Sequence, residues 1–148
     1  MLLLGLLASC GRSPENGSSA NRSDSLERVV AQKDSVINDV FASMNAVAEN
    51  LSAIKLRENI INASLDSGEI PKQSAVKINE DIAAIDRLLQ ENRRTIDRLQ
   101  QSADQLKKAN VRVASLEKLI AQLQSQVESK DQEIVMLRKN LENMNVQV

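Results

Sequence analysis

The chain has 148 residues and a formal net charge of −1, with one Phe (Phe41) and no Trp, Tyr or His. Aromatic side chains bury large areas in globular cores, so this composition argues against a compact globular domain and favours long helices. The balanced charge lacks the basic excess that nucleic-acid binding needs, which predicts no nucleic-acid partner. A single cysteine, Cys10, excludes an intrachain disulfide and a cysteine-based zinc site.

The sequence shows none of the residue patterns on which catalysis usually depends. Without histidine there is no histidine-based pair of nucleophile and base, and the chain has no glycine-rich phosphate loop. We assign the acidic residues Glu80, Asp81, Asp97 and Asp131 to solvated helix faces. We therefore expect no catalytic residue, no cofactor, no metal and no small-molecule substrate, and predict that the protein is not an enzyme.

Residues 1–9 form a short segment that is similar to a signal peptide. The apolar run Leu2–Leu7 is followed by Ala8, Ser9 and Cys10. This run is too short to cross a bilayer as a helix. Small residues before a lone cysteine, behind an apolar run, resemble the lipobox of bacterial lipoproteins. The resemblance implies cleavage before Cys10, lipidation of Cys10 and a membrane-anchored extracytoplasmic protein.

Residues 10–23 are predicted to be a flexible tether, and residues 24–67 the first helix. The tether is rich in Gly, Ser and Asn, contains Pro14 and shows no apolar periodicity. Asp24 offers an N-cap and Glu27 its capping-box partner.

Within the first helix, apolar residues recur at alternating spacings of three and four, which predicts a helix with a heptad seam of about six heptads. Lys33 and Glu58 interrupt this seam. Flanking apolar residues widen the stripe to a width that suits a helical bundle; they are Val29, Val36, Phe41 and Ala48. The seam itself consists of Leu26, Val30, Ile37, Val40, Met44, Val47, Leu51, Ile54, Ile61 and Leu65.

Residues 68–71 are predicted to form a turn, with Gly68 at the helix C-terminus and Pro71 at position N1 of the next helix. Residues 72–148 are predicted to be one long second helix. Its first part, the hairpin arm 72–110, carries a second heptad seam. Folding at Gly68 brings Ile61 near Ile78 and Val40 near Leu99, and places Leu26 near Val113.

The tail, residues 111–148, begins where the seam shifts its phase. Leu106 and Ala109 are both seam residues but lie only three positions apart, which we interpret as a stammer within one continuous helix. Its a positions are mostly β-branched and its d positions mostly leucine, a pattern that favours a parallel dimer. Across such a dimer Arg112 would pair with Glu117, and Glu133 with Arg138. The predicted fold is thus all-α: a long helical hairpin that continues into a coiled coil and forms a homodimer. The alternatives are closure of two hairpins into a four-helix bundle and one unbroken parallel rod.

Two polar residues, Asn92 and Lys130, occupy d positions of the two later seams. Polar seam residues cost stability and often fix the alignment or the number of helices. We therefore predict that these two side chains specify register.

Two short sequences, Asp24-Ser25-Leu26 and Asp34-Ser35-Val36, resemble the acceptor motif for O-glycosylation of exported proteins in Bacteroidetes. The resemblance implies modification at Ser25 and Ser35. The competing interpretation is chance and the polar composition of a helix start.

Four segments resemble uncharacterised coiled-coil lipoproteins of the Bacteroidetes type: residues 25–39, 91–93, 104–108 and 130–134. This family implies export, lipid anchoring and a place in the cell envelope, at the outer membrane, and implies no activity. Its members run longer, and this chain stops at Val148 inside a heptad, so we expect a C-terminally truncated chain. The predicted function is a structural or scaffolding role as a spacer or assembly stalk. The alternative is a regulator whose hairpin docks on an envelope enzyme or transport complex.

Overall fold

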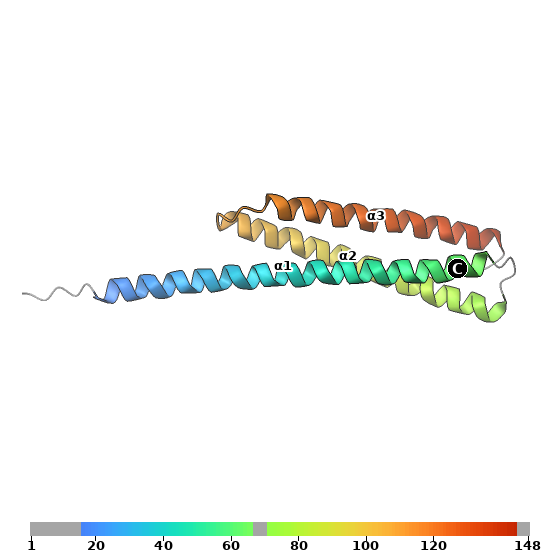
Figure 1. The fold of residues 1–148 in the computed structure, drawn as a ribbon, viewed down its shortest axis with the longest axis horizontal. Coiled ribbons are helices and arrows are strands. Elements are labelled where there is room, and N and C mark those ends of the chain that lie inside the picture. The colour runs from blue at the N-terminus through green and yellow to red at the C-terminus, as the bar shows by residue number, and fades with distance from the viewer. Residues whose placement is uncertain (1–15, 67–70, 145–148) are drawn as a thin grey trace, which may run out of the picture. The chain divides into compact units, whose positions relative to one another are not determined.

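The structure is a computed structural model that describes residues 16–66 and 71–144. These residues form three helices, α1 (Asn16–Leu65), α2 (Lys72–Lys108) and α3 (Ala114–Asn143), and include no strand (Figure 1). The prediction of an all-α chain is confirmed for this part of the protein. None of the three helices has a stretch that is long and apolar enough to cross a membrane.

The chain divides into two units, Met1–Ser35 and Val36–Val148. In the first unit, every side chain from residue 21 to residue 35 is exposed except that of Lys33, which is half-buried. The second unit contains the hydrophobic core, to which all three helices contribute at heptad spacing. Helix α1 supplies Val40, Val47, Ile54 and Ile61; helix α2 supplies Ile78, Ile82, Ile85, Leu89, Ile96, Leu99, Ala103 and Leu106; helix α3 supplies Ile120, Val127, Ile134, Leu137 and Leu141.

Within the second unit, α1 and α2 are antiparallel, as the hairpin prediction requires. The Asn50 side chain donates a hydrogen bond to Asn92, and Arg57 forms an ion pair with Asp81. Moving forward along α1 therefore means moving backward along α2. Residues 67–70, including Gly68, lie outside the described residues.

The expectation of one continuous helix over residues 72–148 is wrong, because α2 ends at Lys108 in a Schellman motif. Asn110 adopts the left-handed conformation, with φ of 58°. The N–H of Val111 donates to the carbonyl of Leu106 at 2.9 Å, and the N–H of Asn110 donates to that of Lys107 at 3.0 Å. The shift of the apolar phase, which we interpreted as a stammer in one helix, thus marks a turn between two helices.

Beyond this turn, α3 folds back antiparallel to α2 (Figure 1). Three ion pairs join the two helices at successive levels: Lys107 with Glu117, Arg93 with Asp131, and Asp86 with Arg138. Glu117 and Arg138, which we expected to pair across a dimer, are therefore paired within one chain. The tail seam is likewise buried against the chain's own core, because a heptad pattern specifies a helical partner but not the chain that supplies it.

Two predicted helix starts also need correction. Helix α1 begins at Asn16, so residues 16–23 of the expected tether are helical and Asp24 is an interior residue instead of an N-cap. Extending an existing helix costs little compared with nucleating one, so residues of modest propensity can join it. Pro71, predicted at position N1, is instead the N-cap residue of α2, with φ of −58° and ψ of 150°, so the first helical residue is Lys72.

Candidate functional site

The predicted modification sites fall into two groups. Cys10, the predicted lipidation site, lies outside the described residues. Ser25 and Ser35 both lie on α1 within the first unit, and both are exposed to solvent. The described part of the chain therefore leaves both residues uncovered.

The central polar site of the second unit joins two residues that interrupt apolar seams. Glu58 of α1 and Lys130 of α3 lie 72 positions apart in the sequence, and Lys130 Nζ donates a hydrogen bond to Glu58 Oε2 at 2.6 Å. The Glu58 side chain is 8% exposed and the Lys130 side chain 20% exposed. The structure therefore brings together two polar residues that the sequence marks only as separate irregularities.

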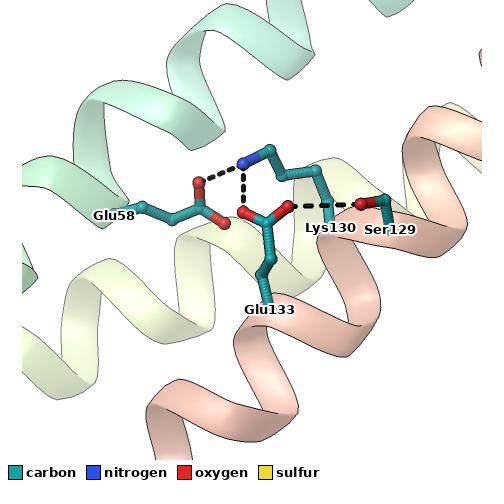
Figure 2. A network of polar contacts seen from close by, with 4 residues as sticks. All are labelled: Glu58, Ser129, Lys130 and Glu133. Carbon is teal, nitrogen blue, oxygen red and sulfur yellow. Dashed lines mark hydrogen bonds and ion pairs between the residues drawn. The ribbon is translucent and has the colours of Figure 1, made fainter.

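Figure 2 shows that Lys130 Nζ also contacts the carboxylate of Glu133, one turn further along α3. The Ser129 hydroxyl donates to Glu133 Oε1 at 3.3 Å and so helps to orient that carboxylate. Glu58 Oε1 accepts no hydrogen bond from the described residues. One ammonium group thus lies between two carboxylates, and the cluster connects α1 to α3 through Glu58.

Burial of Lys130 by itself lowers the pKa of its ammonium group, but the hydrogen bonds to Glu133 and Glu58 and their negative charges outweigh burial. The net effect raises the pKa above the ordinary value of 10.5. A lysine that acts as a nucleophile needs the opposite shift, because only the neutral amine attacks. Lys130 is therefore held as a cation, which suits an ion pair that holds two helices together.

A second polar contact lies in the seam between α1 and α2. Asn50 Nδ2 donates to Asn92 Oδ1 at 2.9 Å, and Asn92 is fully buried. The sequence singled out Asn92 as a register-determining residue, but it gave no indication of its partner, because Asn50 lies beside the seam of α1 and not in it.

Sequence reasoning missed a third polar contact. We expected Asp81 on a solvated face, but its side chain is buried and pairs with Arg57 of α1 and, at 4.0 Å, with Lys77. The available signal was its spacing, since a residue three positions after the seam residue Ile78 lies on the same helix face. Asp131, also assigned to a solvated face, is only partly exposed and pairs with Arg93. Glu80 and Asp97 are exposed, as expected.

Each of these three polar contacts joins a polar residue of α1 to a polar residue of another helix. Two open grooves of about 380 and 400 Å³ lie on either side of the Glu58–Lys130 pair, between α1 and α3. Within residues 16–66 and 71–144, no group of three potential metal-binding side chains comes together. The arrangement is suited to fixing the alignment of helices.

Comparison of the chain with known protein families, with curated proteins and with solved structures finds no match.

Proposed function

We propose that the protein is a lipid-anchored structural or scaffolding protein of the bacterial cell envelope, which acts as a spacer or assembly stalk. The anchor is supported by the sequence alone: the apolar run Leu2–Leu7, two small residues and Cys10. A lipid on Cys10 would hold the chain at a membrane, on its extracytoplasmic side and at the outer membrane.

The observation that carries the structural role is the Glu58–Lys130 ion pair inside the seam between α1 and α3. A pair of apolar residues of similar volume at these positions would often be as stable or more stable, so such a pair contributes little net stability. Sliding α3 by one heptad along α1 would leave both charges buried without their partner, which is strongly unfavourable. The pair therefore favours one alignment, and a fixed alignment gives the body the constant dimensions that a spacer needs.

Metabolic labelling with a clickable palmitate analogue tests the anchor. We expect label on the wild-type protein in a lipoprotein-processing bacterium and none on Cys10→Ala. Ser9→Ala is the matched control, since it changes the neighbouring position to another small residue and should keep the label. An unlabelled wild type, or label that survives Cys10→Ala, would rule out the lipoprotein.

The alternative function, a regulator or adaptor that docks on an envelope enzyme or transport complex, is favoured by one observation. Near the ends that connect α1 to α2, three large apolar side chains are exposed: Leu56 and Ile60 of α1 and Val76 of α2. A contiguous patch of exposed apolar side chains is typical of protein-binding surfaces, and these three residues would contribute to one if they are covered by a partner. The docking partner would be an envelope protein.

Photo-crosslinking in intact cells separates the two functions. A crosslinker at Leu56 or Val76 should capture one dominant second protein if the hairpin is an adaptor. A crosslinker at position 94 serves as the matched control, because Arg94 is an exposed polar residue of α2. If position 56, position 76 and position 94 all yield only copies of this chain or no product, the adaptor is excluded and the stalk is retained.

We also propose that Ser25 and Ser35 are O-glycosylated when the protein is exported. Their exposure on α1 supports this, together with the aspartate that precedes each of them. Intact-mass spectrometry of protein from the native envelope should show a glycan mass that Ser25→Ala and Ser35→Ala each reduce. An unmodified mass would contradict the proposal, and Ser52→Ala is the control at an exposed serine without the motif.

A further inference from the structure

The first unit exposes an apolar stripe that belongs to the same heptad series as the buried core of the second unit. Counting back in sevens from the buried residue Val40 leads to Lys33 and then to Leu26, and Val30 occupies the other seam position between them. Leu26 is 61% exposed and Val30 is 56% exposed, and Val29 beside them is also exposed. A heptad stripe on a helix is a surface that another helix can cover.

We propose that a second copy of this chain covers this stripe, in parallel orientation, so that two copies associate through residues 23–34 of α1. The charges next to the stripe select both the partner and its direction. If Val30 is position a, then Leu26 and Lys33 are d positions, and Glu27 and Asp34 are e positions.

In a parallel pair of helices, the d side chain of one helix lies beside the e position of the other. Lys33 of each copy would then reach Asp34 of its neighbour, which gives two reciprocal ion pairs. The long lysine side chain lets its ammonium leave the apolar seam while its methylene groups remain there. In an antiparallel pair the e positions face each other, which would bring Glu27 against Asp34 and cause repulsion.

This contact is small. Two heptads bury much less than the roughly 800 Å² per partner of a standard stable interface. Association therefore depends on a high local concentration, which attachment of both N-termini to one membrane supplies. In the cell, this inference consequently rests on the proposed lipid anchor. The proposed homodimer contact thus lies in the first unit. In the tail, residues 111–148, where the sequence predicted this contact, α3 is covered by α2 in the structure.

A chemically supplied tether tests the contact independently of lipidation in the cell. Full-length chain from cell-free translation is coupled through Cys10, the sole cysteine, to maleimide lipids in phosphatidylcholine vesicles. The photo-crosslinker p-benzoylphenylalanine is placed at position 26, in the stripe, or at position 28 as the matched control. Arg28 lies two positions after Leu26 and is exposed.

We expect several-fold more crosslinked dimer from position 26 than from position 28, and much less from the same chain left free in solution. With the crosslinker at position 26, Lys33→Asp alone and Asp34→Lys alone should each lower the dimer yield. Combining the two substitutions should restore it, because the reciprocal pairs form again with their charges exchanged. Equal yields from positions 26 and 28, or a double variant no better than the single variants, would overturn the proposal.

The two proposals fail separately. A dimer on vesicles without palmitate labelling in cells would remove the lipid anchor and leave the contact intact. Labelling in cells without a dimer on vesicles would remove the contact and leave the anchor.

Discussion

The two parts of helix α1 follow one apolar heptad series but differ completely in burial. In the second unit, Ile54 is 0% exposed and Val40, Val47 and Ile61 are also buried, whereas Leu26 and Val30 in the first unit are more than half exposed. The difference shows that the series defines which face of a helix is apolar, and that burial of this face depends on a covering helix. The helices α2 and α3 supply that cover in the second unit.

The largest expected effect comes from removing one apolar side chain of α1 in each of the two units. Ile54→Ala should lower the free energy of unfolding by about 2–5 kcal/mol, because it loses buried surface and leaves a cavity. Leu26→Ala, at low protein concentration, should change it by no more than about 0.5 kcal/mol, as for other exposed positions. Urea denaturation followed by circular dichroism at 222 nm measures both. Similar losses from the two variants would show that Leu26 is covered in the free chain.

A second test concerns the buried polar contact of the second unit. Glu58→Ala should lower the free energy of unfolding by about 1–3 kcal/mol, because Lys130 loses one of its two carboxylate partners in a mostly buried seam. Glu133→Ala should cost less, because the Glu133 side chain is 45% exposed.

The double variant Glu58→Leu with Lys130→Met should recover most of that loss, since an apolar pair replaces the whole ion pair. If Glu58→Ala has no effect on urea denaturation, the ion pair does not form in solution.

A third test concerns the turn that makes α3 fold back and so provides the second unit with its third helix. Asn110→Ala should cost about 1 kcal/mol, because alanine pays a penalty in the left-handed conformation that asparagine tolerates better. Asn110→Gly should be neutral or slightly stabilising. Asn45→Ala, at an exposed interior position of α1, is the control and should be slightly stabilising. A stabilising Asn110→Ala would indicate a continuous helix there.

The smallest expected effect is a dependence on pH that comes from Lys130. Its pKa in the folded protein lies above the ordinary 10.5, so the folded state binds this proton more tightly than the unfolded state does. The resulting stabilisation is complete below pH 10.5 and is lost as the pH rises through the folded-state pKa.

The difference in unfolding free energy between wild type and Lys130→Met should therefore be constant from about pH 8 to pH 10 and should shift toward the variant at higher pH. A difference that stays constant above that range would mean that Lys130 is not paired in the folded state.

Several features of the second unit were predictable because they depend on spacing along one helix. The seams of α1 and α2, their hairpin arrangement and the start of α2 near Pro71 follow from apolar periodicity and from the break at residues 68–71. The polar residues Asn92, Lys130 and Glu58 were also recognised as interruptions of their seams, and the role of Asn92 and Lys130 in specifying register stays a prediction. The pairing of Asn92 with Asn50 and of Lys130 with Glu58 was not predicted, since contacts across 42 and 72 positions depend on how the helices are arranged.

The end of α2 was within reach of sequence reasoning but was misinterpreted. Asparagine is the residue other than glycine that most readily adopts the left-handed conformation, and Asn110 follows two lysines that suit a helix C-terminus. The phase shift between Leu106 and Ala109 agrees equally well with a helix end and with a stammer in one continuous helix, and we interpreted it as a stammer. A β-branched and leucine seam after it then favoured a dimer, although the same seam packs well inside one chain.

The sequence by itself determined that the chain is helical, which faces of the helices are apolar and where polar residues interrupt those faces, because these properties depend on residues within a few turns of each other. Only the tertiary structure decided that α3 returns along α2, that Lys130 meets Glu58, and that Asp81 is buried against Arg57. These contacts join residues far apart in the sequence, and an apolar heptad seam accepts a helix from its own chain or from another on nearly equal terms. In this chain the turn at Asn110 directs α3 back along α2. The buried charges of Glu58 and Lys130 are stable only opposite each other, and so favour packing within one chain.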